Sequence, residues 1–115
     1  PASISEVLRP LFSPGLQRYM IDLFSHDPLR LARDWQGSML IVQGDADLQV
    51  RLLDADLLEN ALPDARRVTL SGGTHMLKGD VPGRPFATYT DPLIPLHEDL
   101  LPAVVGFLED YSKTD

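Results

Sequence analysis

Apolar and polar residues recur at helical spacing through residues 1–36, where prolines and capping residues divide the chain into short helices. The segment "SISE" at residues 3–6 has the spacing of a capping box, before a helix that Pro10 should end. Ser13, followed by a proline, is typical of a second helix start, and a short amphipathic piece follows the Asp-Pro turn at Asp27. We interpret this part as a helical segment that precedes the sheet and could supply cap or pocket helices.

Residues 37–115 have a different pattern, in which apolar runs alternate with amphipathic stretches. Residues 39–43 are apolar on both faces, as is typical of a parallel strand covered by helices, and residues 67–70 predict a second strand. The stretch 52–62 between them has the period of a helix. A glycine- and proline-rich loop is predicted over residues 71–96.

A last helix is predicted to begin near Asp99, with Pro102 close enough to its first turn to be tolerated. Its apolar positions predict a buried face formed by Leu100, Val104, Phe107 and Leu108. Helices that alternate with apolar strands imply an α/β architecture, here with two parallel strands and helices on either side. Sites in such sheets form at the carboxyl ends of the strands.

The length, net charge and composition of the chain exclude several classes of function. At 115 residues the chain forms one domain at most, and no apolar run approaches the roughly 18 residues of a membrane span. The net charge of −7, with dispersed acids, argues against nucleic-acid binding. The absence of cysteine excludes disulfides, thiolate metal sites and cysteine nucleophiles. No cofactor or metal is indicated.

Three polar residues with catalytic potential follow the predicted strands: Asp45, Asp47 and His75. Neighbouring strands lie about 4.8 Å apart, so an aspartate after one strand can reach a histidine after the next. Such a carboxylate fixes the imidazole tautomer and stabilises the imidazolium, which lets the histidine take a proton from a nucleophile. Alternatively, the acids are turn or cap residues and the histidine only a loop residue. The residues alone do not separate the roles of the two acids.

Three segments together resemble the C-terminal part of an α/β-hydrolase: "MLIVQGDADLQV", "LLDADLLENALPDARRVTLSGGTHMLK" and "PLHEDLLPAVVGFL". Shorter pieces, "DLQV", "HMLK" and "ATYTDP", are similar to bacterial serine hydrolases related to the serine aminopeptidases and prolyl-oligopeptidase-like esterases. In that family the triad acid ends a G-x-x-D motif, and the triad histidine lies in a G-x-x-H context. The resemblance therefore implies Asp47 as the acid and His75 as the base, with Asp45 as a turn or cap residue.

The chain departs from the family pattern in its first half. None of its serines lies in a G-x-S-x-G nucleophile elbow, and the oxyanion-hole loop is missing as well. We therefore expect the C-terminal portion of a larger serine hydrolase, whose parent acts on a small ester or amide substrate. By itself this portion should be inactive. We expect it to associate with the missing N-terminal half or with itself, because a two-stranded sheet leaves open edges.

Other residues are candidates for lesser roles. His26 and Lys78 are candidate substrate contacts in the parent enzyme, although the sequence favours a surface or helix-end position for His26. Arg84 and Tyr89 lie in the same long loop as Lys78. His97 is predicted to be exposed. Trp35, just before the first strand, is predicted to anchor a core or an interface.

Two further functions fit parts of the sequence. The "DAD" at residues 45–47 imitates the D-x-D of Mg²⁺-dependent phosphotransferases, in which the first aspartate is the nucleophile. That motif usually follows the apolar run directly, whereas Gln43 and Gly44 intervene here. The other alternative is a non-catalytic segment that associates with itself or with a partner through its sheet.

Overall fold

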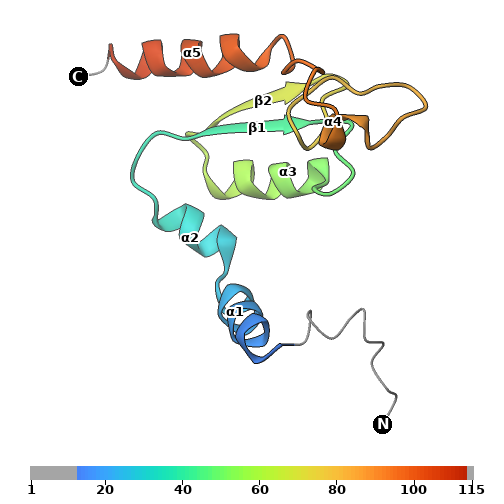
Figure 1. The fold of residues 1–115 in the computed structure, drawn as a ribbon. Coiled ribbons are helices and arrows are strands. Elements are labelled where there is room, and N and C mark those ends of the chain that lie inside the picture. The colour runs from blue at the N-terminus through green and yellow to red at the C-terminus, as the bar shows by residue number, and fades with distance from the viewer. Residues whose placement is uncertain (1–12, 114–115) are drawn as a thin grey trace.

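The computed structural model describes residues 13–113, and Figure 1 shows how their elements are arranged. The helix predicted after residues 3–6 lies outside the described residues. Along the chain the elements are α1 (Pro14–Ser25), α2 (Pro28–Asp34), β1 (Leu40–Gly44), α3 (Leu52–Ala61), β2 (Arg66–Leu70), α4 (Ala87–Thr90) and α5 (Leu100–Tyr111).

The centre of the molecule is a two-stranded parallel sheet. Leu40 pairs with Arg66 at one end, and Gly44 pairs with Leu70 at the other. The connecting helix α3 lies on one face of the sheet, and α5 lies on the opposite face (Figure 1). The predicted α/β architecture, with two parallel strands and helices on either side, is confirmed.

The first two helices begin as their sequences predict. The Ser13 hydroxyl accepts a hydrogen bond from the backbone N–H of Leu16 at 3.3 Å, and a proline occupies the first turn of α1. The Asp27 carboxylate accepts from the backbone N–H groups of Leu29 at 3.0 Å and Arg30 at 3.2 Å, and α2 also begins with a proline. Both caps satisfy N–H groups that have no partner within the helix.

The core is small and lies between the sheet and its two covering helices. Leu70 is fully buried at the end of β2, and Ile41 of β1 and Ala55 of α3 are also buried. Ion pairs tie the elements together at the edge of this core. The Arg67 guanidinium of β2 pairs with Asp56 of α3, and that of Arg66 pairs with Asp110 of α5 at 2.6 Å.

The prediction of a fully buried face on the last helix is wrong in part. Leu100, Val104 and Phe107 are half-buried, but Leu108 is 57% exposed. The reason is the width of the sheet, because two strands offer α5 too narrow a surface to cover all its apolar positions. The short helix α4, inside the predicted loop, was not foreseen either.

Helix α1 extends away from the sheet (Figure 1) and contains no buried residue. Its apolar side chains Tyr19, Ile21 and Phe24 are all more than half exposed. Of the helices between residues 13 and 113, none has the length and apolar character that crossing a membrane requires.

Candidate active site

Asp47 and His75 meet where the two strands end. The Nδ1 atom of His75 lies 2.9 Å from Oδ2 of Asp47, a hydrogen-bond distance. The Asp47 side chain is only 6% exposed, whereas the His75 side chain is 38% exposed. The carboxylate is therefore enclosed, and the imidazole ring remains accessible from outside.

Backbone groups hold the other carboxylate oxygen of Asp47. Its Oδ1 accepts hydrogen bonds from the N–H groups of Gln49 at 2.8 Å and Val50 at 3.0 Å. Burial alone would raise the pKa of Asp47, but the hydrogen bonds from Val50, Gln49 and His75 outweigh burial and lower the pKa below its ordinary value. Asp47 is thus ionised at neutral pH.

An ionised Asp47 decides which nitrogen of His75 carries the proton. A carboxylate can only accept, so Nδ1 of His75 must donate, and the lone pair of a neutral ring is left on Nε2. The ring makes no second hydrogen bond to any residue in the described part of the chain. An oriented, accessible imidazole of this kind can act as a general base.

Hydrogen bonds join the turn that carries Asp47 to the loop that carries His75. The Asp45 carboxylate accepts from the backbone N–H of Gly72 at 2.6 Å. The N–H of Ala46 donates to the carbonyl of Gly73 at 2.9 Å. Asp45 is therefore a turn residue, as the resemblance implies, and in addition it braces the two loops against each other.

Two glycines allow this close approach. A Cβ atom on Gly44 would lie 2.0 Å from the carbonyl oxygen of Gly73, and one on Gly73 would lie 2.7 Å from Cβ of Leu70. Gly72 has a φ of +70°, a left-handed conformation that glycine adopts without strain. A larger residue at position 44 would push the two turns apart, and one at position 73 would clash first with Leu70.

His75 lies in a tight turn at the start of the long loop. The N–H of Leu77 donates to the carbonyl of Thr74 at 2.9 Å, and that of Thr74 donates to the carbonyl of Lys78 at 2.8 Å. Leu77 adopts a φ of +55°, which is unusual for a residue with a branched side chain. The turn fixes the backbone from which the His75 ring extends.

Two residues around Asp47 were missed by sequence reasoning. Gln43 of β1 is 8% exposed, and its Nε2 group donates to Oδ2 of Asp47 at 3.3 Å and to the carbonyl of Val50 at 2.9 Å. The side chain of Gln49 donates to the Tyr89 hydroxyl at 2.9 Å, which links the acid turn, residues 44–50, to α4. A polar residue within an apolar strand was the available signal for Gln43. No local signal pairs residues 49 and 89.

Of the two candidate substrate contacts, Lys78 lies in the turn that carries His75, whereas His26 lies on another element. The Lys78 ammonium donates to the carbonyl of Asp91 at 3.1 Å, so it braces the long loop. His26 lies at the end of α1, near Asp22 at 3.8 Å, and α1 is distant from the strand ends in Figure 1. The role of either residue as a substrate contact stays a prediction. Arg84 lies exposed in the loop.

The prediction that His97 is exposed is wrong, because its side chain is only 9% exposed. Its Nε2 atom donates to the carbonyl of Ser71 at 2.9 Å, and its Nδ1 atom accepts from the N–H of Asp99 at 3.2 Å. His97 thus joins the start of α5 to the loop that leads to His75. His97 and Ser71 are 26 residues apart, which is why the local sequence gave no indication of their contact.

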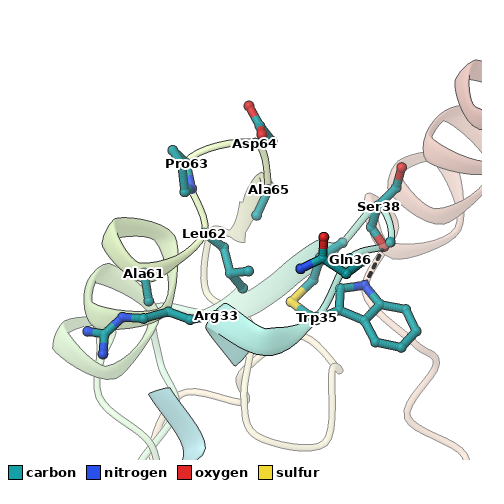
Figure 2. A pocket seen from close by; sticks show the side chains of 11 residues that line it. Arg33, Trp35, Gln36, Ser38, Ala61, Leu62, Pro63, Asp64 and Ala65 are labelled. Atoms are coloured by element: carbon teal, nitrogen blue, oxygen red, sulfur yellow. Dashed lines mark hydrogen bonds between the residues drawn. The ribbon is translucent and has the colours of Figure 1, made fainter. Parts of the chain in front are cut away.

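A pocket of about 430 Å³ lies at the opposite end of the sheet, where the strands begin. Figure 2 shows the Trp35 indole beside it, with Nε1 donating to the carbonyl of Ser38 at 3.4 Å. Trp35 is 55% exposed, so it does not anchor a core within the described part of the chain. The pocket is separated from Asp47 and His75 by the length of the strands.

No set of three or more His, Cys, Asp or Glu side chains among residues 13–113 is arranged to hold a metal ion. Asp45 and Asp47 are the pair considered for Mg²⁺. The Asp45 carboxylate binds the backbone N–H of Gly72, whereas the Asp47 carboxylate binds the ring of His75. Comparison with protein-family models, curated proteins and solved structures finds no match to this chain. The geometry of the site therefore carries the functional argument.

Proposed function

We propose that this chain is the C-terminal segment of an α/β-hydrolase and supplies the acid, Asp47, and the base, His75, of a Ser–His–Asp triad. The observation that carries the proposal is the 2.9 Å contact between Nδ1 of His75 and the buried, ionised carboxylate of Asp47. An aspartate that holds a histidine in this way leaves Nε2 free to take a proton from a hydroxyl.

The direction of the hydrogen bonds supports this role over a purely structural one. Asp47 receives two backbone N–H groups on Oδ1, so this oxygen is held independently of His75. The ring of His75 is accessible, whereas a histidine that only stabilises the fold would gain from being enclosed. The resemblance of the motifs around Gly44–Asp47 and Gly72–His75 to the hydrolase pattern points the same way.

The nucleophile comes from outside these residues in our proposal, because none of the serines of the chain lies in a G-x-S-x-G elbow. A serine hydroxyl attacks the carbonyl carbon of an ester or amide while Nε2 of His75 takes its proton. The ionised Asp47 stabilises the resulting imidazolium, which then protonates the leaving group. Water hydrolyses the acyl-enzyme by the same route, and the serine is regenerated.

The proposal is tested by co-expressing this chain with an N-terminal hydrolase segment that carries the G-x-S-x-G elbow. A fluorophosphonate probe labels an activated serine, so the assembled pair should react and either chain alone should not. With His75→Ala, we expect the labelling rate to fall by a factor of about 10² or more, since general-base catalysis contributes roughly 10²–10⁴.

The matched control is Gln36→Ala, at the end of the sheet opposite to Asp47 and His75, which should leave the labelling rate unchanged. Co-purification of the two chains shows that each variant still assembles. If the assembled pair is labelled equally fast with and without His75, then His75 is not the base and the proposal fails.

One alternative keeps a specific observation in its favour. Within the described residues each strand has a neighbour on one side only, and many large apolar side chains are exposed. A non-catalytic segment that associates with itself would present the same surface. The phosphotransferase alternative gains nothing from the geometry, because the backbone N–H of Gly72 already binds the carboxylate of Asp45, its proposed nucleophile.

A further inference from the structure

Gln43 is a buried polar side chain in an otherwise apolar strand. It is 8% exposed, at the fourth position of β1, and lies four residues before Asp47. Burying a carboxamide costs free energy unless its groups find hydrogen-bond partners, so an apolar residue would be the simpler choice for this position. What the Gln43 side chain contacts therefore indicates what it is for.

The Nε2 group of Gln43 faces acceptors that all belong to the acid turn. It donates to Oδ2 of Asp47 at 3.3 Å, to the carbonyl of Val50 at 2.9 Å and, more weakly, to the carbonyl of Gly44 at 3.5 Å. Oδ2 is the same oxygen that accepts from Nδ1 of His75. One carboxylate oxygen is thus shared between Gln43 and the proposed base.

We propose that Gln43 is a positioning residue, which acts on His75 through Asp47. This inference rests on the proposed function, since it assigns Gln43 a part in the same Asp–His pair. The two backbone N–H groups fix only Oδ1, so the carboxylate can still pivot about that oxygen. Gln43 restrains Oδ2 against this rotation and, through Val50, holds the turn that supplies one of those N–H groups.

The proposal predicts an effect on the tautomer of His75. A neutral imidazole exchanges its proton between Nδ1 and Nε2, and the hydrogen bond to Asp47 favours the Nδ1–H form. A carboxylate that pivots away from the ring favours this form less. The ring ¹⁵N chemical shifts of His75 measure the ratio of the two forms, and this ratio does not follow from stability alone.

The test replaces Gln43 with methionine, which has the same length and no donor. In the neutral ring, we expect Gln43→Met to lower the ratio of Nδ1–H to Nε2–H by up to about tenfold, the change expected when pivoting of the carboxylate costs the His75–Asp47 hydrogen bond. The matched control is Gln36→Met at the opposite end of the sheet, which should leave the ratio unchanged. An unchanged ratio in Gln43→Met shows that Gln43 only fills space.

Asp47→Asn separates this inference from the proposed function on which it rests. If Asp47→Asn leaves the tautomer ratio of His75 as in the wild type, the Asp–His pair itself is wrong. If Asp47→Asn shifts the ratio and Gln43→Met does not, the pair stands and the role of Gln43 is overturned.

A second measurement does not depend on whether Gln43→Met folds. In the wild-type chain, the Nε2 protons of Gln43 should shift as Asp47 is protonated at low pH, because the acceptor loses its charge. The same resonances should be displaced in Asp47→Asn at neutral pH. If they are insensitive to both changes, Gln43 does not bind the carboxylate and the proposal is overturned.

Discussion

At the scale of single residues, the site depends on the hydrogen bonds that protein N–H groups donate to the carboxylate of Asp47. The side chain is nearly enclosed, yet its pKa is lowered, because N–H donors outweigh the cost of burial. These donors come from the turn that follows it, at Gln49 and Val50. The sequence "DLQV" therefore builds an anion site around its own first residue.

This arrangement predicts how stability depends on pH. Because the pKa of Asp47 is lower in the folded chain than its ordinary value of 3.8, the ionised group stabilises the fold above that pH. The contribution is lost as the pH falls below about 4 toward the folded pKa. Urea unfolding between about pH 7 and pH 3 should show a smaller loss of free energy in Asp47→Asn than in the wild type.

Asp110 titrates in the same range, since its pairing with Arg66 lowers its pKa. It is present in both proteins, so its contribution cancels in the comparison. Equal losses of stability in the wild type and in Asp47→Asn would show that Asp47 gains nothing from its donors.

At the scale of elements, the close contact between two turns brings the acid and the base together. Gly44 ends β1 and Gly73 follows β2, and their backbones touch. Gly44→Ala should therefore lower the free energy of unfolding by about 3 kcal/mol, at the upper end of what overpacking costs. Gly79→Ala is the control, because no atom lies within 4 Å of the added Cβ and it should change stability little. Equal effects in the two variants, measured by urea unfolding, would contradict the close approach.

His97 provides a second link between elements. His97→Ala removes the bonds to Ser71 and Asp99 from a nearly buried position, so we expect it to cost about 2 kcal/mol of unfolding free energy. His26→Ala, at an exposed site, should cost less than about 0.5 kcal/mol. Thermal unfolding of both variants measures whether the loss of His97 costs more stability than the loss of the exposed His26. A His97→Ala protein as stable as the wild type would show that the link is dispensable.

The sequence predicts the elements better than it predicts their contacts. The strands were predicted to within a residue at each end, because short apolar runs bounded by turn residues leave little choice. The approach of Asp47 to His75 was also predictable, since parallel neighbours end at the same edge of a sheet. The buried position of His97 depends on contacts between distant residues, and no local pattern records them.

At the scale of the whole molecule, the described chain is extended. Its radius of gyration is 18.2 Å, whereas a compact domain of about 100 residues has about 13 Å. Large apolar side chains are exposed on several elements, among them Phe24 at 77% and Leu101 at 70%. The sequence predicted open edges on a two-stranded sheet, but the exposure of α1 and of Leu108 followed only from the arrangement in space.

This exposed surface predicts association. By itself the chain should bind a dye that is specific for apolar surfaces and elute with a mass above its 12.8 kDa in size-exclusion chromatography with light scattering. We expect the serine-bearing segment to bind the exposed apolar surface of the sheet, where the dye also binds. Association with this segment should therefore reduce dye binding. A folded monomer that binds no dye would contradict this prediction.

The central claim is that Asp47 acts through His75 on a serine, and the labelling rate of the assembled pair tests it most directly. Residues that act as a unit are not additive. We predict that Asp47→Asn and His75→Ala each slow fluorophosphonate labelling, and that the double variant is about as slow as His75→Ala alone. Effects that multiply in the double variant would show that the two residues act independently, and the triad assignment would be wrong.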